Sequence, residues 1–549
     1  METKQSSKQL QLFAGAFILG ALLFIMCYGA GVLDVTYDDW IFHMIDPDIK
    51  QHYLGWCFYR NSPWQFPLGL MENLAYPAKM SILWTDSMPL VAMILKPFSP
   101  LLPTTFQYIG WYGLLSTALT SGIGALILYK LTRSRIVSFI ASACFAVAPH
   151  MLQRMFYHTT LTAQWLILLP ILWWINDVYK LDLRKKLMLW AGYSFVAVTI
   201  HPYLWAMGCF IWAFIALEEL IVTHKLSACI LEAVSLIAAA VFGLWIMGAF
   251  YGGVNSEYIA GGYESNLNTL INPLGKSRIF HDLPLAVGLQ YEGYGYLGAG
   301  VILLVIISAL ALVLKKIRKN KIFTLRRSLM LLMFIFFFFF AVFPEISVNE
   351  HMIKILPQPG LIGKFFGTFR STGRFIWPVV WLCIIGSVTV LKRSLKENAV
   401  IILVAFCMFV QLYDLSTAIA DKKESLKTEK IADSDLDDPT LTACIDHYRH
   451  VVMVYDDNID MNDLAYFAYR YGLTINRYYF ARDINEQIEE NLEDYRQKLT
   501  NGEDVSDCIF VMKESELANW TMFDLHFYFL NGSYIGVSEP IEGLEELYL

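Results

Sequence analysis

Long apolar stretches separated by short polar loops occupy the first three quarters of the chain, whereas residues 421–549 are dense in Asp, Glu, Lys and Arg. A hydrocarbon core about 30 Å thick is crossed by roughly 20 apolar residues in a helix. The pattern therefore predicts a polytopic α-helical membrane protein. We expect about eleven transmembrane helices, near residues 11–33, 105–129, 136–150, 161–179, 187–201, 203–222, 227–250, 297–314, 328–344, 374–391 and 398–416.

The distribution of basic residues predicts which side of the membrane each loop occupies, because short cytoplasmic loops carry an excess of Lys and Arg. If the N-terminus is cytoplasmic, every clustered basic loop falls on the inner side, at residues 130–135, 180–186, 225, 315–327 and 392–396. The outer loops are longer, acidic and rich in aromatic residues, at 34–104, 151–160, 251–296 and 345–373, together with a short turn at 201–202 and the tail. Any chemistry is therefore expected outside the cytoplasm.

Two domains are predicted, a membrane domain at 1–416 with an extracytoplasmic loop at 34–104, and a soluble extracytoplasmic domain at 417–549. In the tail, apolar runs of strand type alternate with segments of helical spacing, which is typical of an α/β domain. We expect strands at 451–455, 508–512 and 534–538, and helices at 461–472 and 484–499. The tail lacks a glycine-rich phosphate loop and a nucleophile elbow, so a recognition or packing role is favoured. Cys444 and Cys508 share this domain, and their spacing leaves open whether they pair.

The composition supports the membrane assignment and argues against one class of partner. Of the 549 residues, 56% are hydrophobic and only 17% charged, below the roughly 25% of soluble domains. A formal net charge of −7 is unlike the basic surface that a nucleic-acid partner requires.

The first outer loop has the residues of a folded segment that lies on the bilayer rather than of a solvated connector. Five aspartates fall in its first fifteen residues and four tryptophans are spread along it, and about 70 residues without structure would be unusual. The aspartates are Asp34, Asp38, Asp39, Asp46 and Asp48.

Several motifs in the membrane part resemble the C-type (GT-C) glycosyltransferase superfamily, and more narrowly an uncharacterised bacterial branch of it. They are DPDIKQHYLGW (46–56), PLG (67–69), TDSMPL (85–90), HTTLTAQWLIL (158–168), EGYGYLGAG (292–300) and FRSTGRF (369–375). The resemblance implies a multi-pass enzyme of the bacterial cytoplasmic membrane, in the hexosyltransferase class. Such an enzyme moves a sugar from a polyprenyl-phosphate donor to an extracytoplasmic acceptor, usually with inversion.

The resemblance also places the catalytic aspartate of the superfamily at Asp48, because of its distance from the HYLGW segment. Asp46 is the reserve candidate, since its Asp-Pro pair is typical of a helix start. A helix-capping role is the alternative for both residues. In a helix, His52 would share a face with Asp48 and could orient that carboxylate or bind sugar.

Arg370 and Arg374 are the candidate ligands for the donor phosphate. They are four residues apart and would project from one face at the start of the helix at 374–391. Guanidinium groups bind phosphate oxygens through a bidentate fork. Interfacial anchoring is the alternative, but basic anchors are disfavoured at an outer helix end.

Weaker candidates for sugar contacts lie at or near the outer membrane boundary, although a lone polar residue there is more often a structural hydrogen-bond partner. They are Asp86, His158, Gln164, His201, Asn272 and Glu292. Some relatives in the superfamily use a divalent cation such as Mg²⁺ or Mn²⁺, for which Asp38, Asp39 and Asp48 are conceivable ligands.

The sequence thus favours an inverting glycosyltransferase with a cell-envelope glycan as acceptor. A polyprenyl-linked lipid transporter or flippase is the alternative. A flippase should place charged residues along its helices, and here the predicted helices hold little charge beyond Glu218, Glu219 and Glu232. A sensor or scaffold would leave the loop motifs unexplained.

Overall fold

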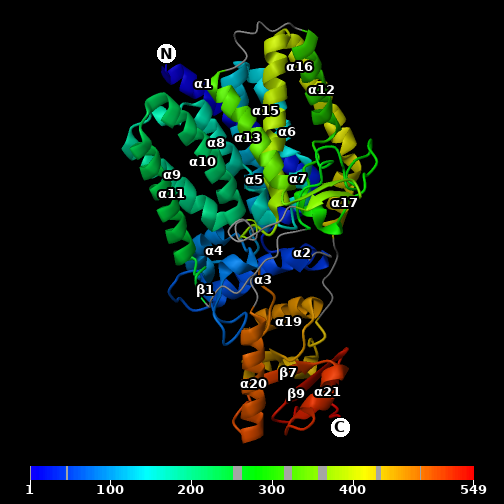
Figure 1. The fold of residues 1–549 in the computed structure, drawn as a ribbon. Helices are drawn as coiled ribbons and strands as arrows, with labels where there is room; N and C mark the ends of the chain where they lie inside the picture. The colour runs from blue at the N-terminus through cyan, green and yellow to red at the C-terminus, as the bar shows by residue number, and fades with distance from the viewer. Residues whose placement is uncertain are drawn as a thin grey trace. The chain divides into compact units, whose positions relative to one another are not determined.

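The helices of the structure, a computed structural model, follow the apolar pattern of the sequence (Figure 1). The structure describes residues 2–44, 47–251, 262–314, 324–355, 366, 368–427, 434–481 and 484–548. Among them, eight helical segments are long and apolar enough to cross a membrane. Asp46 and most of the basic loop predicted at 315–327 lie outside the described residues.

Each of the eleven predicted segments coincides with a helix, but three of them are not among the eight candidate spans. The segment at 161–179 becomes a short helix ending at Ile175, with Pro170 inside it. The helix at 297–314 has 16 residues in the described part of the chain, Ala299–Leu314. The third, Leu183–Ile200, begins with a polar turn that contains Arg184 and Lys185. The prediction of a polytopic helical membrane protein is therefore confirmed. The described residues contain eight candidate spans, where about eleven helices were predicted.

The chain divides into two compact units. Unit 1 comprises residues 1–37, 107–240 and 257–427, and unit 2 comprises 38–106, 241–256 and 428–549. The α-helices of unit 1 are α1 (Glu2–Tyr28), α5 (Ile109–Thr132), α6 (Arg135–Ala146), α7 (Pro149–Arg154), α8 (Trp165–Ile175), α9 (Leu183–Ile200), α10 (Pro202–Thr223), most of α11 (Leu226–Ile246), α12 (Ala299–Leu314), α13 (Leu325–Val342), α15 (Trp377–Ser394), α16 (Glu397–Asp414) and α17 (Ser416–Ser425). Its other elements are the 3-10 helices η1 (Gly31–Leu33), η4 (Thr159–Thr162), η5 (Val178–Lys180), η6 (Gly288–Gly293) and η8 (Thr372–Ile376), and a hairpin of β3 (Glu345–Val348) and β4 (His351–Ile355).

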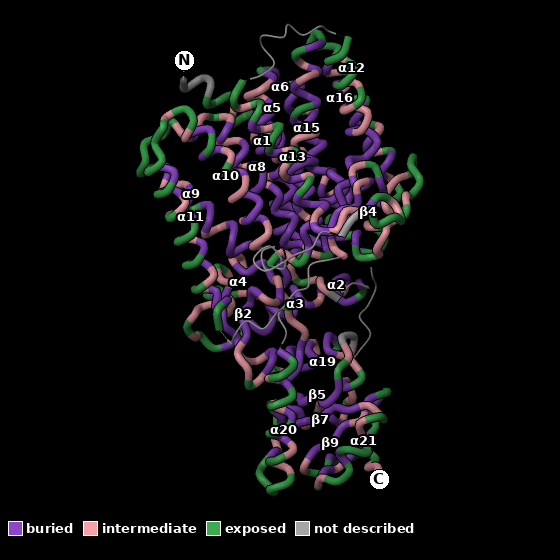
Figure 2. The backbone as a smooth tube through the Cα atoms, viewed as in Figure 1, coloured by how far each residue is buried: buried purple, intermediate pink, exposed green. Residues whose placement is uncertain are grey.

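The centre of unit 1 is built around α5, α6 and α15 (Figure 2). The candidate spans that contain these helices are 67%, 78% and 72% buried, whereas those of α1 and α11 are 28% buried. Small residues allow close helix packing, since a Cβ at Gly20 of α1 would lie 2.9 Å from the Cα of Ala118 on α5. The remaining apolar faces of the peripheral helices are available to lipid.

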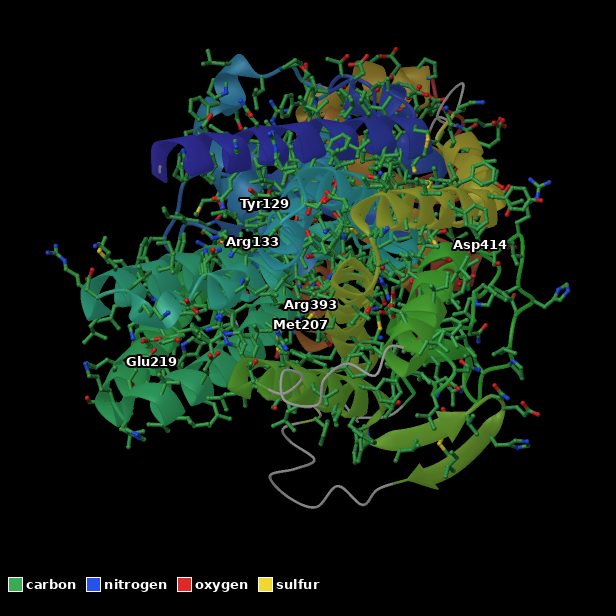
Figure 3. All side chains as sticks on the ribbon, turned by 90° about the horizontal axis from the view of Figure 1, so that it is seen from above. Tyr129, Arg133, Met207, Glu219, Arg393 and Asp414 are labelled. Atoms are coloured by element: carbon green, nitrogen blue, oxygen red, sulfur yellow. The ribbon has the colours of Figure 1, made fainter. Side chains whose placement is uncertain are left out.

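Asp414, the last residue of α16, bonds to the loop that precedes α12 and to the start of that helix (Figure 3). Its carboxylate accepts hydrogen bonds from the Tyr296 hydroxyl at 2.8 Å and the Ala299 N–H at 2.9 Å. A carboxylate at the first turn of a helix also interacts favourably with the helix dipole. This fully buried contact fixes the loop that carries Glu292.

Unit 2 contains a mixed five-stranded sheet in the order β6-β5-β7-β9-β8. Strand β5 is parallel to β6 and β7, and β9 is antiparallel to β7 and β8. The bounds are β5 (His450–Met453), β6 (Thr474–Ile475), β7 (Cys508–Met512), β8 (His526–Leu530) and β9 (Ser533–Val537), with helices α18 (Pro439–Ala443), η9 (Ile445–His447), α19 (Asn458–Arg470), α20 (Asn485–Asn501) and α21 (Glu514–Trp520). The three predicted strands and two predicted helices of the tail are confirmed. Cys444 and Cys508 are both free thiols.

The first loop is folded and forms part of the same unit as the tail. Its elements are α2 (Asp39–His43), α3 (Pro47–Asn61), β1 (Leu70–Met71), β2 (Met80–Ser81), η2 (Ile82–Thr85), α4 (Pro89–Leu95) and η3 (Lys96–Leu101). The Tyr76 N–H donates to the Ile475 carbonyl at 2.9 Å, and the Ile475 N–H donates to the Asn73 carbonyl at 3.0 Å. The loop backbone thereby continues the sheet beyond β6, and α19 packs on α3.

Candidate functional site

In unit 2, Asp48 lies in the first turn of α3 and is half-buried. The helix begins at Pro47, whose fixed φ and missing N–H suit a first helical position. The hydroxyl of Tyr479, from the segment after β6, lies 3.5 Å from Asp48 Oδ1. The candidate base is therefore held at a helix start in contact with the C-terminal part of the same unit.

His52 lies one turn further along α3 and is fully buried. The structure brings it to Asp86, with His52 Nε2 3.4 Å from Asp86 Oδ2. Asp86 has a positive φ of 50° at the end of η2, which turns its carboxylate toward the helix. The pair supplies one nitrogen and one oxygen of the kinds that bind transition-metal cations.

Asp38 has a structural role in unit 2. Its buried carboxylate accepts a hydrogen bond from the Tyr53 hydroxyl at 2.8 Å and lies 3.4 Å from the Tyr466 hydroxyl. Burial raises the pKa of Asp38 above its ordinary value, in spite of these hydrogen bonds. In the part of the chain that the structure describes, Asp38, Asp39 and Asp48 do not gather their oxygens into a metal-binding group. That predicted set of cation ligands is therefore not formed.

In unit 1, a buried carboxylate collects two arginines and a histidine. Arg154, at the end of α7, donates from Nη1 and Nη2 to Glu292 Oε1 and Oε2, at 3.2 and 2.8 Å. Arg374 of η8 donates from Nε to Glu292 Oε2 at 2.9 Å. His158 Nε2 lies 3.6 Å from Glu292 Oε1. We call these four residues the Glu292 cluster.

The Glu292 cluster carries more positive than negative charge. Burial by itself would raise the pKa of Glu292, but Arg154, Arg374 and His158 hold that pKa well below its usual range. The carboxylate is thus ionised at neutral pH and balances only one of two guanidinium groups. These four side chains lie in a largely buried site, where charges are poorly screened by salt.

Arg370 contributes a further guanidinium close to this cluster. It donates from Nη2 to the Tyr263 hydroxyl at 2.8 Å and stacks on that ring. The Ser371 N–H next to it donates to the Tyr203 hydroxyl at 2.8 Å, and Arg374 stacks on the same Tyr203 ring, with its Cζ 4.8 Å from the ring centroid. Tyr203 therefore contacts the segment that carries the two predicted arginines.

The expectation that Arg370 and Arg374 share one face of a regular helix is wrong. Residues 369–371 form a bend and are not helical, and the chain then enters the 3-10 helix η8 before α15 begins at Trp377. Gly373 allows this segment to pack closely, since a Cβ there would lie 2.6 Å from the Tyr263 carbonyl oxygen and from the Gly293 Cα. Arg374 thus lies in η8 and reaches Glu292, whereas Arg370 precedes the helix.

Three of the weaker candidates have structural hydrogen bonds. Gln164 accepts from the Trp381 indole at 3.0 Å, and His201 caps α10 by accepting from the Tyr203 N–H at 3.1 Å. Asn272 donates to the Leu283 carbonyl at 2.8 Å and accepts from the Leu283 N–H at 3.0 Å. Each is a structural hydrogen-bond partner, as a lone boundary residue commonly is. His158 and Glu292 instead contact each other, and Asp86 contacts His52.

Arg154 is the cluster member that the sequence candidates did not include. It lies in the loop at 151–160, which the basic-residue pattern assigns to the outer side. Arginine is disfavoured at outer helix ends, and the same reasoning had selected Arg370 and Arg374. Applied to every outer loop, it would have found Arg154 as well.

Three carboxylates within the helices of unit 1, Glu218, Glu219 and Glu232, form ion pairs with basic residues. Lys186 pairs with both Glu219 and Glu232, and Arg326 pairs with Glu218. Glu219 lies on α10 (Figure 3). These carboxylates are therefore partnered in the packed bundle, as buried charges usually are.

Comparison with known proteins gives two family matches and a distant structural likeness. A model described as "Domain of unknown function (DUF6311)" matches residues 17–416, and one described as "DUF6311 C-terminal domain" matches residues 440–538. No curated protein matches the chain. One similar solved structure is the Archaeoglobus fulgidus oligosaccharyltransferase tethered to an acceptor peptide by a disulfide bond. It is 10% identical, with 96% of this chain and 74% of that chain covered and a TM-score of 0.41.

Proposed function

The chain belongs to the DUF6311 family, and we propose that it is a membrane glycosyltransferase that transfers a sugar from a polyprenyl-phosphate donor to a cell-envelope glycan. The observation that carries the proposal is the Glu292 cluster, where Arg154 and Arg374 share one buried carboxylate. A site with excess guanidinium charge near the membrane surface suits a lipid-linked phosphate. The basic-loop pattern supports an outer location for this site, and the proposal assigns the protein to the cytoplasmic membrane of a bacterium.

The proposed reaction inverts the anomeric centre. Asp48 removes the proton from an acceptor hydroxyl as its oxygen attacks the anomeric carbon. The bond between that carbon and the donor phosphate oxygen breaks, and polyprenyl phosphate leaves with the bonding electron pair. Arg370, Arg374 and Arg154 stabilise the phosphate by charge-assisted hydrogen bonds. A flippase is disfavoured because its helices should carry charges that line a hydrophilic path for the lipid headgroup. Here Glu218, Glu219 and Glu232 form ion pairs instead.

The deciding experiment uses the purified full-length protein in lipid nanodiscs with radiolabelled polyprenyl-phosphate hexoses and an envelope glycan fraction. We expect release of polyprenyl phosphate and label in the glycan, with release dependent on the acceptor. In proteoliposomes, movement of the intact donor across the bilayer without release would instead establish the transporter. If no donor of this class gave release of polyprenyl phosphate or label in the glycan, the proposal would be overturned.

Substitution of Arg374 by lysine should lower the kcat/KM for donor by roughly ten- to a hundred-fold. Lysine keeps the charge, but it loses the planar fork that can bond Glu292 and a phosphate together, and a charge-assisted hydrogen bond contributes about 1.5–3 kcal/mol. Arg370→Lys should act in the same direction. Initial rates across donor concentrations measure both effects.

Arg278→Lys is the matched control, since Arg278 is an exposed arginine of the same unit that also stacks on a tyrosine, Tyr413, with its Cζ 4.8 Å from the ring centroid. It should leave kcat/KM unchanged. An Arg370→Lys, Arg374→Lys double variant that uses donor at the wild-type rate would reduce both arginines to interfacial anchors.

A further inference from the structure

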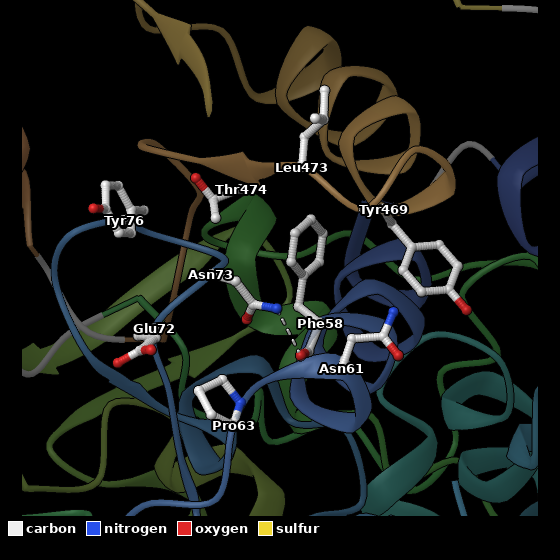
Figure 4. Close-up of a pocket in the computed structure, with 10 residues that line it drawn as sticks. Phe58, Asn61, Pro63, Glu72, Asn73, Tyr76, Tyr469, Leu473 and Thr474 are labelled. Carbon is white, nitrogen blue, oxygen red and sulfur yellow. Dashed lines mark hydrogen bonds between the residues drawn. The ribbon is translucent and has the colours of Figure 1, made fainter. Parts of the chain in front are cut away.

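A half-open pocket of about 240 Å³ lies in unit 2, between the first loop and the edge of the sheet at β6 (Figure 4). Three aromatic side chains, Phe58, Tyr76 and Tyr469, line it together with the amides of Asn61 and Asn73. The volume is below the roughly 300–1,000 Å³ of sites for drug-sized ligands. The pocket therefore suits a small group, or one unit of a longer chain.

The polar atoms of the pocket offer hydrogen bonds to a neutral ligand. Asn73 donates from Nδ2 to the Phe58 carbonyl at 3.1 Å, as Figure 4 shows, while its buried Oδ1 has no hydrogen-bond partner among the described residues. A buried acceptor without a partner is costly, so a small movement of the Asn73 side chain that exposes it to a bound hydroxyl or amide is favourable. Asn61 is exposed at the end of α3 and adds a second amide at the rim.

The charge of the lining disfavours an anion. Among the described residues that line the pocket there is a carboxylate, Glu72, and no basic side chain. Lys79 lies 3.4 Å from Glu72 and neutralises part of that charge from outside the lining. A phosphate would thus meet a carboxylate without a facing cation, in contrast to the arginine-rich Glu292 cluster of unit 1.

The walls of the pocket are held in place before any ligand binds. Tyr76 stacks on His450 with ring centroids 4.3 Å apart and an interplanar angle of 14°. The Tyr469 hydroxyl donates to the Thr104 carbonyl at 2.7 Å. Because these rings are already ordered, a ligand that stacks on them loses little binding energy to side-chain ordering.

We propose that this pocket binds a neutral hexose or N-acetylhexosamine unit of the acceptor glycan, so the inference rests on the proposed function. Sugar rings present apolar C–H faces to aromatic rings and hydroxyls to amides, which matches this lining. At 1.5 Å per residue, Phe58 lies about 15 Å along α3 from Asp48. The pocket therefore holds a unit several rings away from the acceptor end and makes the enzyme specific for a polymer.

The test measures binding of maltotetraose and of chitotetraose to the full-length protein in nanodiscs, by calorimetry and without donor. The Asn61→Trp variant places a large side chain at the exposed rim of the pocket and leaves the core intact. Asn519→Trp, at an exposed position of α21 in the same unit, is the matched control. We expect wild type to bind at least one tetrasaccharide, Asn61→Trp to weaken that binding at least ten-fold, and Asn519→Trp to leave it unchanged.

Asn73→Ala supplies a second variant, which removes the unpaired acceptor and should weaken binding several-fold. If wild type binds neither sugar, or if Asn61→Trp binds as wild type does, the pocket is not a glycan site. Binding needs no donor and no turnover. Intact tetrasaccharide binding with no sugar transfer would therefore count against the proposed function alone, and transfer without binding would count against the pocket alone.

Discussion

Replacement of Asp48 by asparagine should lower the rate of sugar transfer by roughly 10²–10⁴-fold, the contribution of a positioned general base. The amide keeps the shape of the side chain and can still face the Tyr479 hydroxyl, but it cannot take a proton from the acceptor. Loss of a carboxylate from the first turn of α3 costs only about 0.3–1 kcal/mol of helix-dipole interaction. Single-turnover rates at saturating donor measure the effect on chemistry, and the unfolding temperature verifies the fold.

Asp446→Asn makes the same chemical change at an exposed aspartate of unit 2 and should leave the rate unaltered. Asp46→Asn tests the reserve candidate. A wild-type rate in Asp48→Asn together with a large loss in Asp46→Asn would move the base by two residues. Wild-type rates in both variants would remove the catalytic role of this motif.

The membrane helices were predictable because each one is a local property of the sequence. An apolar run of sufficient length has few alternatives in a bilayer, where every backbone polar group must be bonded within the segment. The break between α9 and α10 at His201 also follows from local signals, since Pro202 begins a helix and His201 caps it. Where a helix proved shorter than predicted, as in α8, which ends at Ile175, the hydropathy pattern did not encode the end of the helix.

In the tail, the buried runs at β5, β7 and β9 were visible as apolar segments, but β6 and β8 were not predicted. Strand β6 has only two residues, and its outer neighbour is the loop segment at Asn73–Tyr76, some 400 residues earlier. Pairing over such a separation leaves no periodic pattern near either segment. For the same reason, the union of the first loop with the tail in one unit was not predicted from composition.

The sequence offered some residues of the candidate site, but not Arg154 and not the geometry. Asp48 and His52 are four residues apart on one helix, so their proximity is local. The partners of Glu292 lie 138 residues before it and 82 after it, and only the tertiary fold brings them together. The charge pattern identified outer arginines, but it could not show that two of them share a carboxylate.

Replacement of Glu292 by glutamine should destabilise unit 1 by about 3–5 kcal/mol, because Arg154 would remain buried with no compensating charge. The glutamine amide keeps the volume of the side chain and one acceptor oxygen. The loss of stability therefore reports the missing charge and not a change in packing. Thermal unfolding in detergent micelles, followed by tryptophan fluorescence, should show a transition lower by several degrees.

The effect should depend on pH in a defined direction. The folded-state pKa of Glu292 lies below its ordinary value, so the stability that it contributes is fully present above the unfolded pKa of about 4.3. That stability is lost as pH falls through the lower, folded pKa. The difference between wild type and Glu292→Gln should therefore be constant from about pH 6 to 8 and shrink below about pH 4.

Glu350→Gln provides the matched control, since Glu350 is an exposed glutamate of the same unit whose nearest basic partner is the exposed His351. It should unfold as wild type does over the whole pH range. If Glu292→Gln were equally stable at neutral pH, Arg154 would not depend on this carboxylate. The excess of positive charge inferred for the Glu292 cluster would then have to be compensated elsewhere, and its attraction for a donor phosphate would lose its physical basis.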